Sequence, residues 1–342
     1  MNSLQSSNPL PTVRDVETAA RRIAGQAIET PLLEWPALNE RIGGRVLVKP
    51  ELLQRTGSFK FRGAYNKLKH LTEGGAGKGG VVAYSSGNHA QGVAAAAQIL
   101  GLPAVIVMPA DAPAIKLANT RNYGAEIVLY DRVKDNREAI AETLAARRQA
   151  TIVRPYDDPD IIAGQGTTGH EMAHQAKARG IDLDAALLPC GGGGLIAGST
   201  LALRAAWPQL PVYACEPAAY DDTRRSLLAH RRLPVEPGGQ SICDGLMAPS
   251  PGELTFALND RLLAGGIAVS DDEVLLAMAF AFRIMKLVVE PSGAVALAAL
   301  LTGRFDCRDR NVGLVCSGGN VDPDLFARCL ELDRLGLKHT DA

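Results

Sequence analysis

The sequence predicts an α/β protein whose parallel strands alternate with helices. Short segments such as 81–84, 104–108 and 185–188 are wholly apolar and are separated by stretches with helical patterning. Strands buried on both faces have this continuous apolar character, which is typical of parallel sheets covered by helices. Many of the apolar segments end at glycine or polar residues, and open α/β sheets bind ligands at the carboxyl ends of their strands.

The first part of the chain is expected to begin with a helix over 13–28, which ends before a proline. An apolar strand follows at 46–49, and turn-forming residues then precede a helix over 60–71. Residues 73–80 are rich in glycine and are expected to be a linker.

Beyond this linker, strands and helices alternate regularly. Apolar segments of strand length are followed by alanine-rich segments with helical periodicity. The expected elements are strands at 81–84, 104–108, 127–130, 151–153, 185–188, 212–214 and 312–316, with helices at 90–100, 112–123 and 137–148. The order of these elements predicts parallel sheets with helices on both faces.

Length and composition are those of an ordinary globular protein. The 342 residues are 46% hydrophobic and 21% charged, and this length suits two domains. The formal net charge of -1 gives no electrostatic basis for binding nucleic acid. The most apolar region, 277–301, is interrupted by charged residues and a proline, so we expect buried helices there and no membrane span.

Cysteine usage and the first residues bear on the cellular compartment. The 6 cysteines form no CxxC pair and are expected to be reduced thiols. Residues 1–11 are polar and lack the charged-then-apolar pattern of a signal peptide. We therefore expect a cytoplasmic protein.

Residues 58–64, Ser-Phe-Lys-Phe-Arg-Gly-Ala, contain the first candidate for chemistry. Lys60 follows an apolar strand and a turn, and Phe59 and Phe61 flank it. Burial beside aromatic rings disfavours the ammonium form and lowers the pKa of a lysine. A lysine in that state can attack a carbonyl group and hold it as a Schiff base.

Three further blocks follow predicted strands. Ser-Ser-Gly-Asn-His at 85–89 leads into a helix whose first N–H groups can bind an anion, although Ser and Asn there are also ordinary N-caps. Four consecutive glycines precede Leu195; they suit N–H groups that converge on a phosphate, with a flexible turn as the alternative. Ser317 lies in Cys-Ser-Gly-Gly-Asn at 316–320, where its hydroxyl could bond a ring nitrogen or the glycines could form an ordinary turn.

In this order and at these separations, the four blocks resemble those of the fold type II pyridoxal phosphate (PLP) enzymes, which have the tryptophan synthase beta-like fold. Within that group the chain is similar to the threonine/serine dehydratase family, and in particular to its serine racemase and hydroxyaspartate dehydratase branch. The resemblance runs from residue 13 to residue 326 and so covers nearly the whole chain.

The resemblance implies two doubly wound open-sheet domains with the cofactor between them. A large PLP-binding domain would comprise residues 1–80 and 156–342, and a small mobile domain, 81–155, would clamp the substrate. Closure of the small domain would exclude water from the site. The resemblance also implies a homodimer.

Each residue of the blocks receives a role from the resemblance. Lys60 would hold PLP and act as the base at Cα, and Phe59 would pack against the cofactor ring. The other cofactor contacts would be Asn88 to the ring hydroxyl, Gly191, Gly192, Gly193, Gly194 and Leu195 to the phosphate, and Ser317 to the pyridine nitrogen. The substrate carboxylate would be bound by Ser85, Ser86, Asn88 and His89.

The implied reaction is ammonia-lyase chemistry on a β-hydroxy amino acid, L-threonine or L-serine, which gives a 2-oxo acid and ammonia. A neutral Ser317 hydroxyl would leave the pyridine nitrogen unprotonated or nearly so, which suits prompt β-elimination. The alternatives are a serine racemase, a 3-hydroxyaspartate dehydratase, a dehydratase of hydroxyectoine breakdown and a PLP-binding protein without turnover. In racemases a serine at the place of Ser86 is the second acid/base, opposite Lys60; here Ser86 either has that role or only binds the carboxylate.

Three further features are carried over from the resemblance. Glu216, the Tyr220 carbonyl and Asp222 would bind Mg²⁺ or Ca²⁺ through hard oxygen ligands, with a solvated acidic helix start as the alternative. Arg137 would bind a second substrate carboxylate near the mouth of the cleft, or be a surface arginine. Glu290 would lie near the cofactor ring or have a structural role at a helix end.

One motif points to a different chemistry. Residues 170–174 read His-Glu-Met-Ala-His, which is the HExxH pattern of zinc proteases. The third ligand of the extended pattern is missing and Lys177 stands where that pattern has a glycine, so we expect no zinc site. Side-chain specificity is expected to depend on the loops around Tyr156 and 241–245 and on Arg137.

Overall fold

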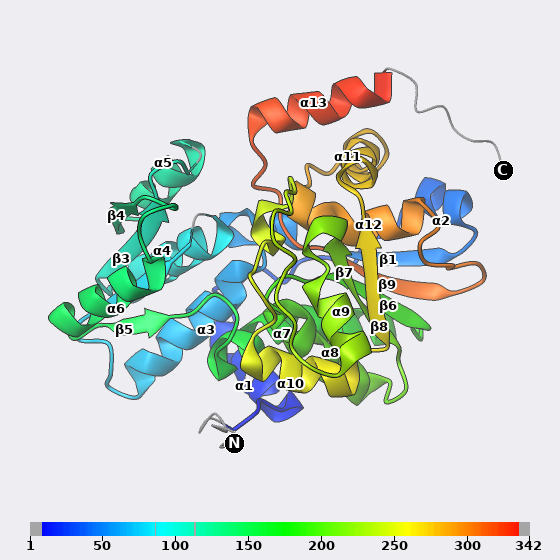
Figure 1. The fold of residues 1–342 in the computed structure, drawn as a ribbon. Helices are drawn as coiled ribbons and strands as arrows, with labels where there is room; N and C mark the ends of the chain where they lie inside the picture. Colours follow the sequence, from blue (N-terminus) through cyan, green and yellow to red (C-terminus); the bar gives the residue numbers. More distant parts are fainter. Residues whose placement is uncertain (1–8, 86, 113, 335–342) are drawn as a thin grey trace.

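The computed structural model describes residues 9–85, 87–112 and 114–334, which form two bodies built on separate sheets (Figure 1). One sheet has five strands in the order β1-β9-β6-β7-β8, and the other has four in the order β4-β3-β2-β5. The larger sheet contains β1 (Arg45–Pro50), β6 (Ala185–Pro189), β7 (Val212–Pro217), β8 (Gly265–Val269) and β9 (Asn311–Cys316). The smaller sheet contains β2 (Val81–Tyr84), β3 (Ala104–Pro109), β4 (Glu126–Tyr130) and β5 (Thr151–Val153).

Neighbouring strands run parallel in both sheets. In the larger sheet, for example, Arg45 of β1 lies opposite Asn311 of β9, and Pro50 lies opposite Cys316. The carboxyl ends of parallel strands lie along one edge of a sheet, which is where ligands bind in this class of fold. The loops that follow β2, β6 and β9 therefore leave their sheets at the edges where a site is expected.

Helices surround each sheet. With the smaller sheet, at the left of Figure 1, lie α4 (Asn88–Leu100), α5 (Ala114–Asn122) and α6 (Arg137–Arg148). The other helices are α1 (Val13–Ile23), α2 (Pro36–Ile42), α3 (Lys60–Glu73), α7 (Pro159–Ala178), α8 (Gly194–Ala206), α9 (Asp222–Ala229), α10 (Glu253–Leu262), α11 (Asp271–Phe280), α12 (Pro291–Leu301) and α13 (Pro323–Arg334). In the described part of the chain, none of the helices combines the length and the apolarity that crossing a membrane requires.

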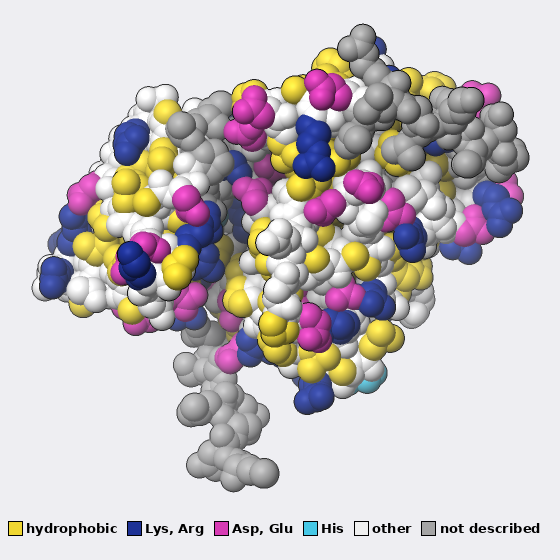
Figure 2. Space-filling view, turned by 45° about the horizontal axis from the view of Figure 1, so that its top comes forward, with side chains coloured by type: hydrophobic (Ala, Val, Ile, Leu, Met, Phe, Trp, Pro, Cys, Tyr) yellow, Lys and Arg dark blue, Asp and Glu magenta, His cyan; other side chains and the backbone are white. Residues whose placement is uncertain are grey.

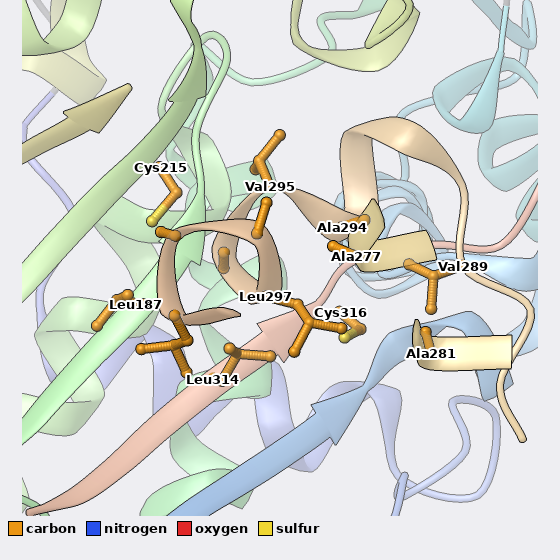
Figure 3. Packing of buried hydrophobic residues seen from close by; sticks show 14 of the residues in the cluster. Leu187, Cys215, Ala277, Ala281, Val289, Ala294, Val295, Leu297, Leu314 and Cys316 are labelled. Atoms are coloured by element: carbon orange, nitrogen blue, oxygen red, sulfur yellow. The ribbon is translucent and has the colours of Figure 1, made fainter. Parts of the chain in front are cut away.

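The helix α12 lies in the core of the larger body. Its first ten residues are all buried, in agreement with a sequence that is apolar on every face of the helix. Val295 and Leu297 belong to the same hydrophobic cluster as Leu187, Cys215 and Leu314 of the larger sheet (Figure 3). The helix α12 confirms a buried helix in this apolar region, whereas Phe282, Ile284 and Val288, which precede it, are exposed.

The helices α7 and α8 pack in close contact at two glycines. A Cβ atom on Gly198 of α8 would stand 2.0 Å from the carbonyl oxygen of Ile162, and one on Gly166 would stand 2.6 Å from the carbonyl oxygen of Gly198. Only glycine permits backbones to approach this closely. The close packing fixes the position of α8, whose first residue belongs to the run of four glycines.

The predicted α/β class with parallel sheets is confirmed, and the strands 81–84 and 151–153 and the helix 137–148 match to the residue. The helix expected over 13–28 instead ends at Ile23, because Gly25 has a φ of 75° and turns the chain. All 6 cysteines lie outside any disulfide, in agreement with the reduced thiols that we expected, and all are buried. The domain boundaries near residues 80 and 155 stay a prediction.

Candidate functional site

A pocket lies between the two sheets, beside the carboxyl ends of their strands. Its volume is about 1020 Å³, including the solvent at its mouth. Figure 2 shows the surface hollowed between the smaller body, at the left, and the larger one. The side chains and loops that line the pocket include Phe59, Lys60, Ser85, Asn88, His89, Lys116, Arg137, Tyr156, the glycine loop (residues 191–194), Leu195, Asp244, Glu290 and Ser317.

Lys60 is the first residue of α3 and is half-buried in this pocket. Its Nζ donates a hydrogen bond of 2.7 Å to the carbonyl oxygen of Pro155 and lies 5.1 Å from the centre of the Phe59 ring. Burial lowers the pKa of Lys60 to about 8, which confirms the predicted direction. A large share of this amine is therefore neutral and nucleophilic at mildly alkaline pH.

Asn88 begins α4 and is held from two sides. Asn320 Nδ2 donates to Asn88 Oδ1 at 2.7 Å, and Asn88 Nδ2 donates to Glu290 Oε1 at 2.5 Å. Glu290 is the residue before α12 and is only 2% exposed. Burial raises the pKa of Glu290 to about 7, and the nearby Asp244 carboxylate adds to the effect. The two interpretations of Glu290 are compatible, since it both starts a helix and lines the pocket.

His89 lies next to Asn88 and is buried as a neutral imidazole. Burial is the main cause that lowers its pKa to about 3, and the Lys60 charge lowers it further. The ring Nε2 donates to the Val153 carbonyl oxygen at 3.0 Å, so Nδ1 carries no proton and has no hydrogen-bond partner. A neutral Nδ1 cannot donate to a carboxylate, so any substrate contact of this residue must use its backbone N–H.

The glycine loop lies between the end of β6 and the start of α8. Gly193 has a φ of 92° and is the N-cap residue of α8, so the backbone N–H groups of the first turn are not used within the helix. A Cβ on Gly192 would stand 2.3 Å from the ring of Tyr156, and one on Gly191 would stand 2.9 Å from the Leu246 backbone. Close packing and a positive φ therefore require glycine here, and the helix start can bind an anion.

Ser317 follows β9, is 3% exposed and lines the pocket. The Phe59 backbone N–H donates to the Ser317 carbonyl oxygen at 3.1 Å, which ties the end of β9 to the residue before Lys60. Ser85 and Leu195 also line the pocket. The predicted Ser86 lies outside the described residues.

Arg137 lies at the start of α6, is half-buried and lines the pocket, and its role as a substrate ligand stays a prediction. Its guanidinium lies 5.6 Å from the centre of the Tyr84 ring.

Two pocket residues were not identified from the sequence. Lys116 was not found, and Asp244 was marked only as part of a loop; these two side chains form an ion pair within the pocket lining. No local pattern surrounds Lys116 that would have identified it.

A family model described as pyridoxal-phosphate dependent enzyme matches residues 23–318. The chain belongs to this PLP family. It is 43% identical over 322 residues to an L-threo-3-hydroxyaspartate ammonia-lyase of Pseudomonas sp, covering 94% of this chain and 99% of the relative. It is 40% identical over 321 residues to the serine racemase of Schizosaccharomyces pombe, covering 94% and 98%. The crystal structure of a T.th. threonine deaminase matches with a TM-score of 0.85 and 44% identity, covering 91% of this chain and 99% of that one.

The residues in the pocket fit the cofactor of the PLP family. A buried lysine amine with a pKa of about 8 suits an aldehyde. The glycine loop offers helix-start N–H groups with no side chain in front of them, which suits a phosphate. The hydroxyl of Ser317 and the amide of Asn88 supply polar groups that line the same pocket as the lysine.

A second polar locus lies at the carboxyl end of β7 and the start of α9. Glu216 and Asp222 are each 1% exposed, so the interpretation as a solvated acidic helix start is wrong. The Glu216 carboxylate accepts from the backbone N–H groups of Thr223 and Arg224 at 2.9 and 2.8 Å, whereas Asp222 Oδ2 has no partner. Burial raises the pKa of Glu216 to about 8 and that of Asp222 to about 7.

Glu216 and Asp222 supply only two side-chain ligands for a metal ion. Among the described residues, no group of three or more His, Cys, Asp or Glu side chains is placed to hold a metal ion. A cation here would need the two carboxylates, a backbone oxygen such as that of Tyr220, and water molecules. The buried, partnerless Asp222 oxygen fits such an ion.

The HExxH motif lies on α7 outside the pocket lining. Its glutamate, Glu171, forms ion pairs with Lys49 at 2.6 Å and with Arg62 at 2.5 Å. Arg62 also pairs with Glu51 at 2.6 Å, and both of those side chains are fully buried. Glu171 is therefore committed to a structural network and is not free to activate water.

Proposed function

We propose that the chain is a PLP-dependent ammonia-lyase that converts a β-hydroxy amino acid, L-threonine or L-serine, to a 2-oxo acid and ammonia. One observation carries the proposal: Lys60, the glycine loop and Ser317 line the same pocket. They come from three separate places in the chain, the start of α3, the turn between β6 and α8, and the end of β9. These are the amine, the phosphate site and the ring partner that the cofactor requires.

The residues that would hold the cofactor follow from this arrangement. Lys60 Nζ would bind its aldehyde carbon, Phe59 would pack beside the ring, residues 191–195 would bind the phosphate, and Ser317 would be the partner of the pyridine nitrogen; all of them line the pocket. Bound PLP supplies the electron sink that weakens the Cα–H bond of the substrate. Asn88 would contact the ring hydroxyl, and Glu290 and Asn320 hold its amide in place.

The protein contributes proton transfer and orientation. Lys60, with its lowered pKa, takes the proton from Cα at mildly alkaline pH. The substrate carboxylate lies at the start of α4, where Ser85 and the backbone N–H groups of Asn88 and His89 bind it. Ser317, a neutral partner, would leave the ring nitrogen unprotonated or nearly so, which would suit prompt loss of the β-hydroxyl.

A second candidate substrate is 3-hydroxyaspartate, and the position of Arg137 supports it. This guanidinium lines the pocket, where it can bind the carboxylate on Cβ that threonine and serine lack. Racemisation would need a second acid/base on the substrate face opposite Lys60, the role considered for Ser86.

The test follows 2-oxo acid release from L-threonine, L-serine and L-threo-3-hydroxyaspartate by the holoenzyme, with chiral analysis of the remaining amino acid. Oxo-acid release without the enantiomer would support the ammonia-lyase, whereas faster appearance of the enantiomer would make the chain a racemase. Arg137→Met should lower kcat/KM for hydroxyaspartate about 100-fold and change that for threonine less than about twofold. Arg147→Met, on the exposed last turn of the same helix, is the matched control.

We further propose that Glu216, the Tyr220 carbonyl oxygen and Asp222 bind Mg²⁺ or Ca²⁺. The support is the burial of two carboxylates with an unpartnered Asp222 oxygen. Oxygen ligands of this kind suit hard cations. The site is separate from the pocket, so the ion would stabilise the fold and take no part in the chemistry.

A further inference from the structure

We propose that Thr255 and Asn259 of α10 are positioning residues for the cofactor phosphate, which act by fixing the peptide planes of the glycine loop. This inference rests on the proposed function, since it assigns the loop to the phosphate. Neither residue lines the pocket; both are fully buried behind the loop.

The first contact is a hydrogen bond to the loop backbone. Thr255 Oγ1 donates to the carbonyl oxygen of Gly192 at 2.6 Å, and the Gly252 backbone N–H donates to the same oxygen at 3.3 Å. In a trans peptide the C=O and the following N–H point in opposite directions. The Gly192 carbonyl is drawn toward α10, so the N–H of Gly193 points away from α10 and toward the pocket.

The second contact is the amide of Asn259. Thr255 and Asn259 are four residues apart and so share one face of α10. Asn259 Nδ2 lies 2.8 Å from the place that a Cβ on Gly193 would occupy. Both polar atoms of this buried amide lack a hydrogen-bond partner, so their bonding capacity is available to loop peptides that shift when an anion binds.

The start of α10 is itself anchored. The Asp157 carboxylate accepts hydrogen bonds from the backbone N–H groups of Glu253, Leu254 and Thr255 at 3.0, 2.9 and 3.3 Å. Tyr156, the residue before Asp157, places its ring against Gly192. The loop is therefore supported from α10 on one side and from the Tyr156 segment on another, which orients its N–H groups before a ligand arrives.

The test measures PLP binding to the apoprotein by fluorescence titration, together with the ³¹P NMR shift of the bound phosphate. Thr255→Val keeps the shape of the side chain and removes the donor; it should weaken PLP binding about tenfold and move the ³¹P shift. Thr255→Ser keeps the donor and should bind within about twofold of the wild type. Asn259→Leu should weaken binding in the same direction.

The matched control is Thr200→Val, which removes an equally buried hydroxyl on α8 that has no hydrogen-bond partner. If Thr255 were merely structural, Thr255→Val would lower the unfolding temperature of the apoprotein but leave its PLP affinity equal to that of Thr200→Val, which would overturn the inference. Asn259→Leu and Thr255→Ser decide the matter should Thr255→Val not fold. Failure of the wild type to bind PLP would instead overturn the proposed function, and the inference with it.

Discussion

Lys116 of α5 and Asp244, in the loop between α9 and α10, form an ion pair that joins the two bodies across the pocket. The lysine is 6% exposed, whereas nearly half of the aspartate side chain remains in solvent. The pair holds the two walls of the pocket together, and we predict that it favours closure of the smaller body.

Lys116→Met should therefore reduce the closed population and raise KM for the amino-acid substrate. An ion pair worth about 1 kcal/mol corresponds to roughly a fivefold change. Steady-state kinetics at saturating PLP measures it. Lys134→Met removes an exposed pair with Asp131 in the same body and should leave KM unchanged. Equal KM values for the two variants would show that the Lys116 pair does not govern closure.

Lys60→Ala should abolish both oxo-acid release and the visible absorbance of the protein with PLP, because Lys116, the other lysine among the described lining residues, is held in an ion pair with Asp244. Lys69→Ala, on the exposed side of the same helix, is the control. In the wild type, the rate at which the apoprotein captures PLP should rise with pH through a midpoint near about pH 8, since the neutral amine is the nucleophile. If the capture rate instead had its midpoint near about pH 10.4, roughly the pKa of a free lysine side chain, the result would contradict the burial of Lys60.

The acidic pair predicts a cation-dependent stability. The pKa values of Glu216 and Asp222 are raised from 4.5 and 3.8 to about 8 and about 7, so folding favours their protonated forms. Their contribution to stability is present below the unfolded pKa values and is lost as pH rises toward 8. A bound cation reverses this loss, so the rise in Tm on adding Mg²⁺ or Ca²⁺ should be larger at pH 8 than at pH 6.

At a cation concentration of about 100 times Kd, the expected stabilisation is about 2.7 kcal/mol, or a rise in Tm of several degrees. Asp222→Asn should remove the response, which differential scanning calorimetry measures. Asp221→Asn is the matched control, because Asp221 is already paired with Arg224 and Arg225. A cation response that survives in Asp222→Asn would place the ion elsewhere.

The buried ion network around Arg62 should be costly to break. Glu51→Gln leaves the fully buried Arg62 with fewer compensating charges and should lower the free energy of unfolding by about 3–5 kcal/mol. The exposed pair of Asp306 and Arg308 should contribute little, and Asp306→Asn should leave the denaturation midpoint almost unchanged. Chemical denaturation compares the two variants, and similar effects would refute the distinction between buried and exposed pairs.

Much of the fold was predictable because its strands are apolar throughout, as in 81–84, which can be read without knowledge of their neighbours. The strand β8 was missed, since it begins Gly265-Gly266 and its half-buried edge position leaves no continuous apolar run. Edge strands of this kind form because a neighbouring strand offers hydrogen-bond partners. The residues of the edge strand alone do not indicate that such a neighbour exists.

The site likewise contains residues that a local sequence pattern reveals and residues that only the fold reveals. Lys60 and Ser317 lie in blocks whose composition is unusual, whereas Lys116, Thr255 and Asn259 have ordinary surroundings in the sequence. Their importance comes from tertiary packing that joins distant segments: Lys116 meets a partner 128 residues away, and Thr255 one that is 63 residues away. No spacing rule in one sequence could have found these pairs.

The burial of α12 has a consequence for how the protein opens. Glu290 and Ser292, at the start of this helix, form part of the pocket wall, and the helix is covered on every side by the core of the larger body. Its amide hydrogens can exchange with solvent only when that core unfolds. The opposite wall packs in separate hydrophobic clusters around the smaller sheet. We therefore expect amide hydrogens in the wall formed by α12 to exchange more slowly than those in the wall formed by the smaller body.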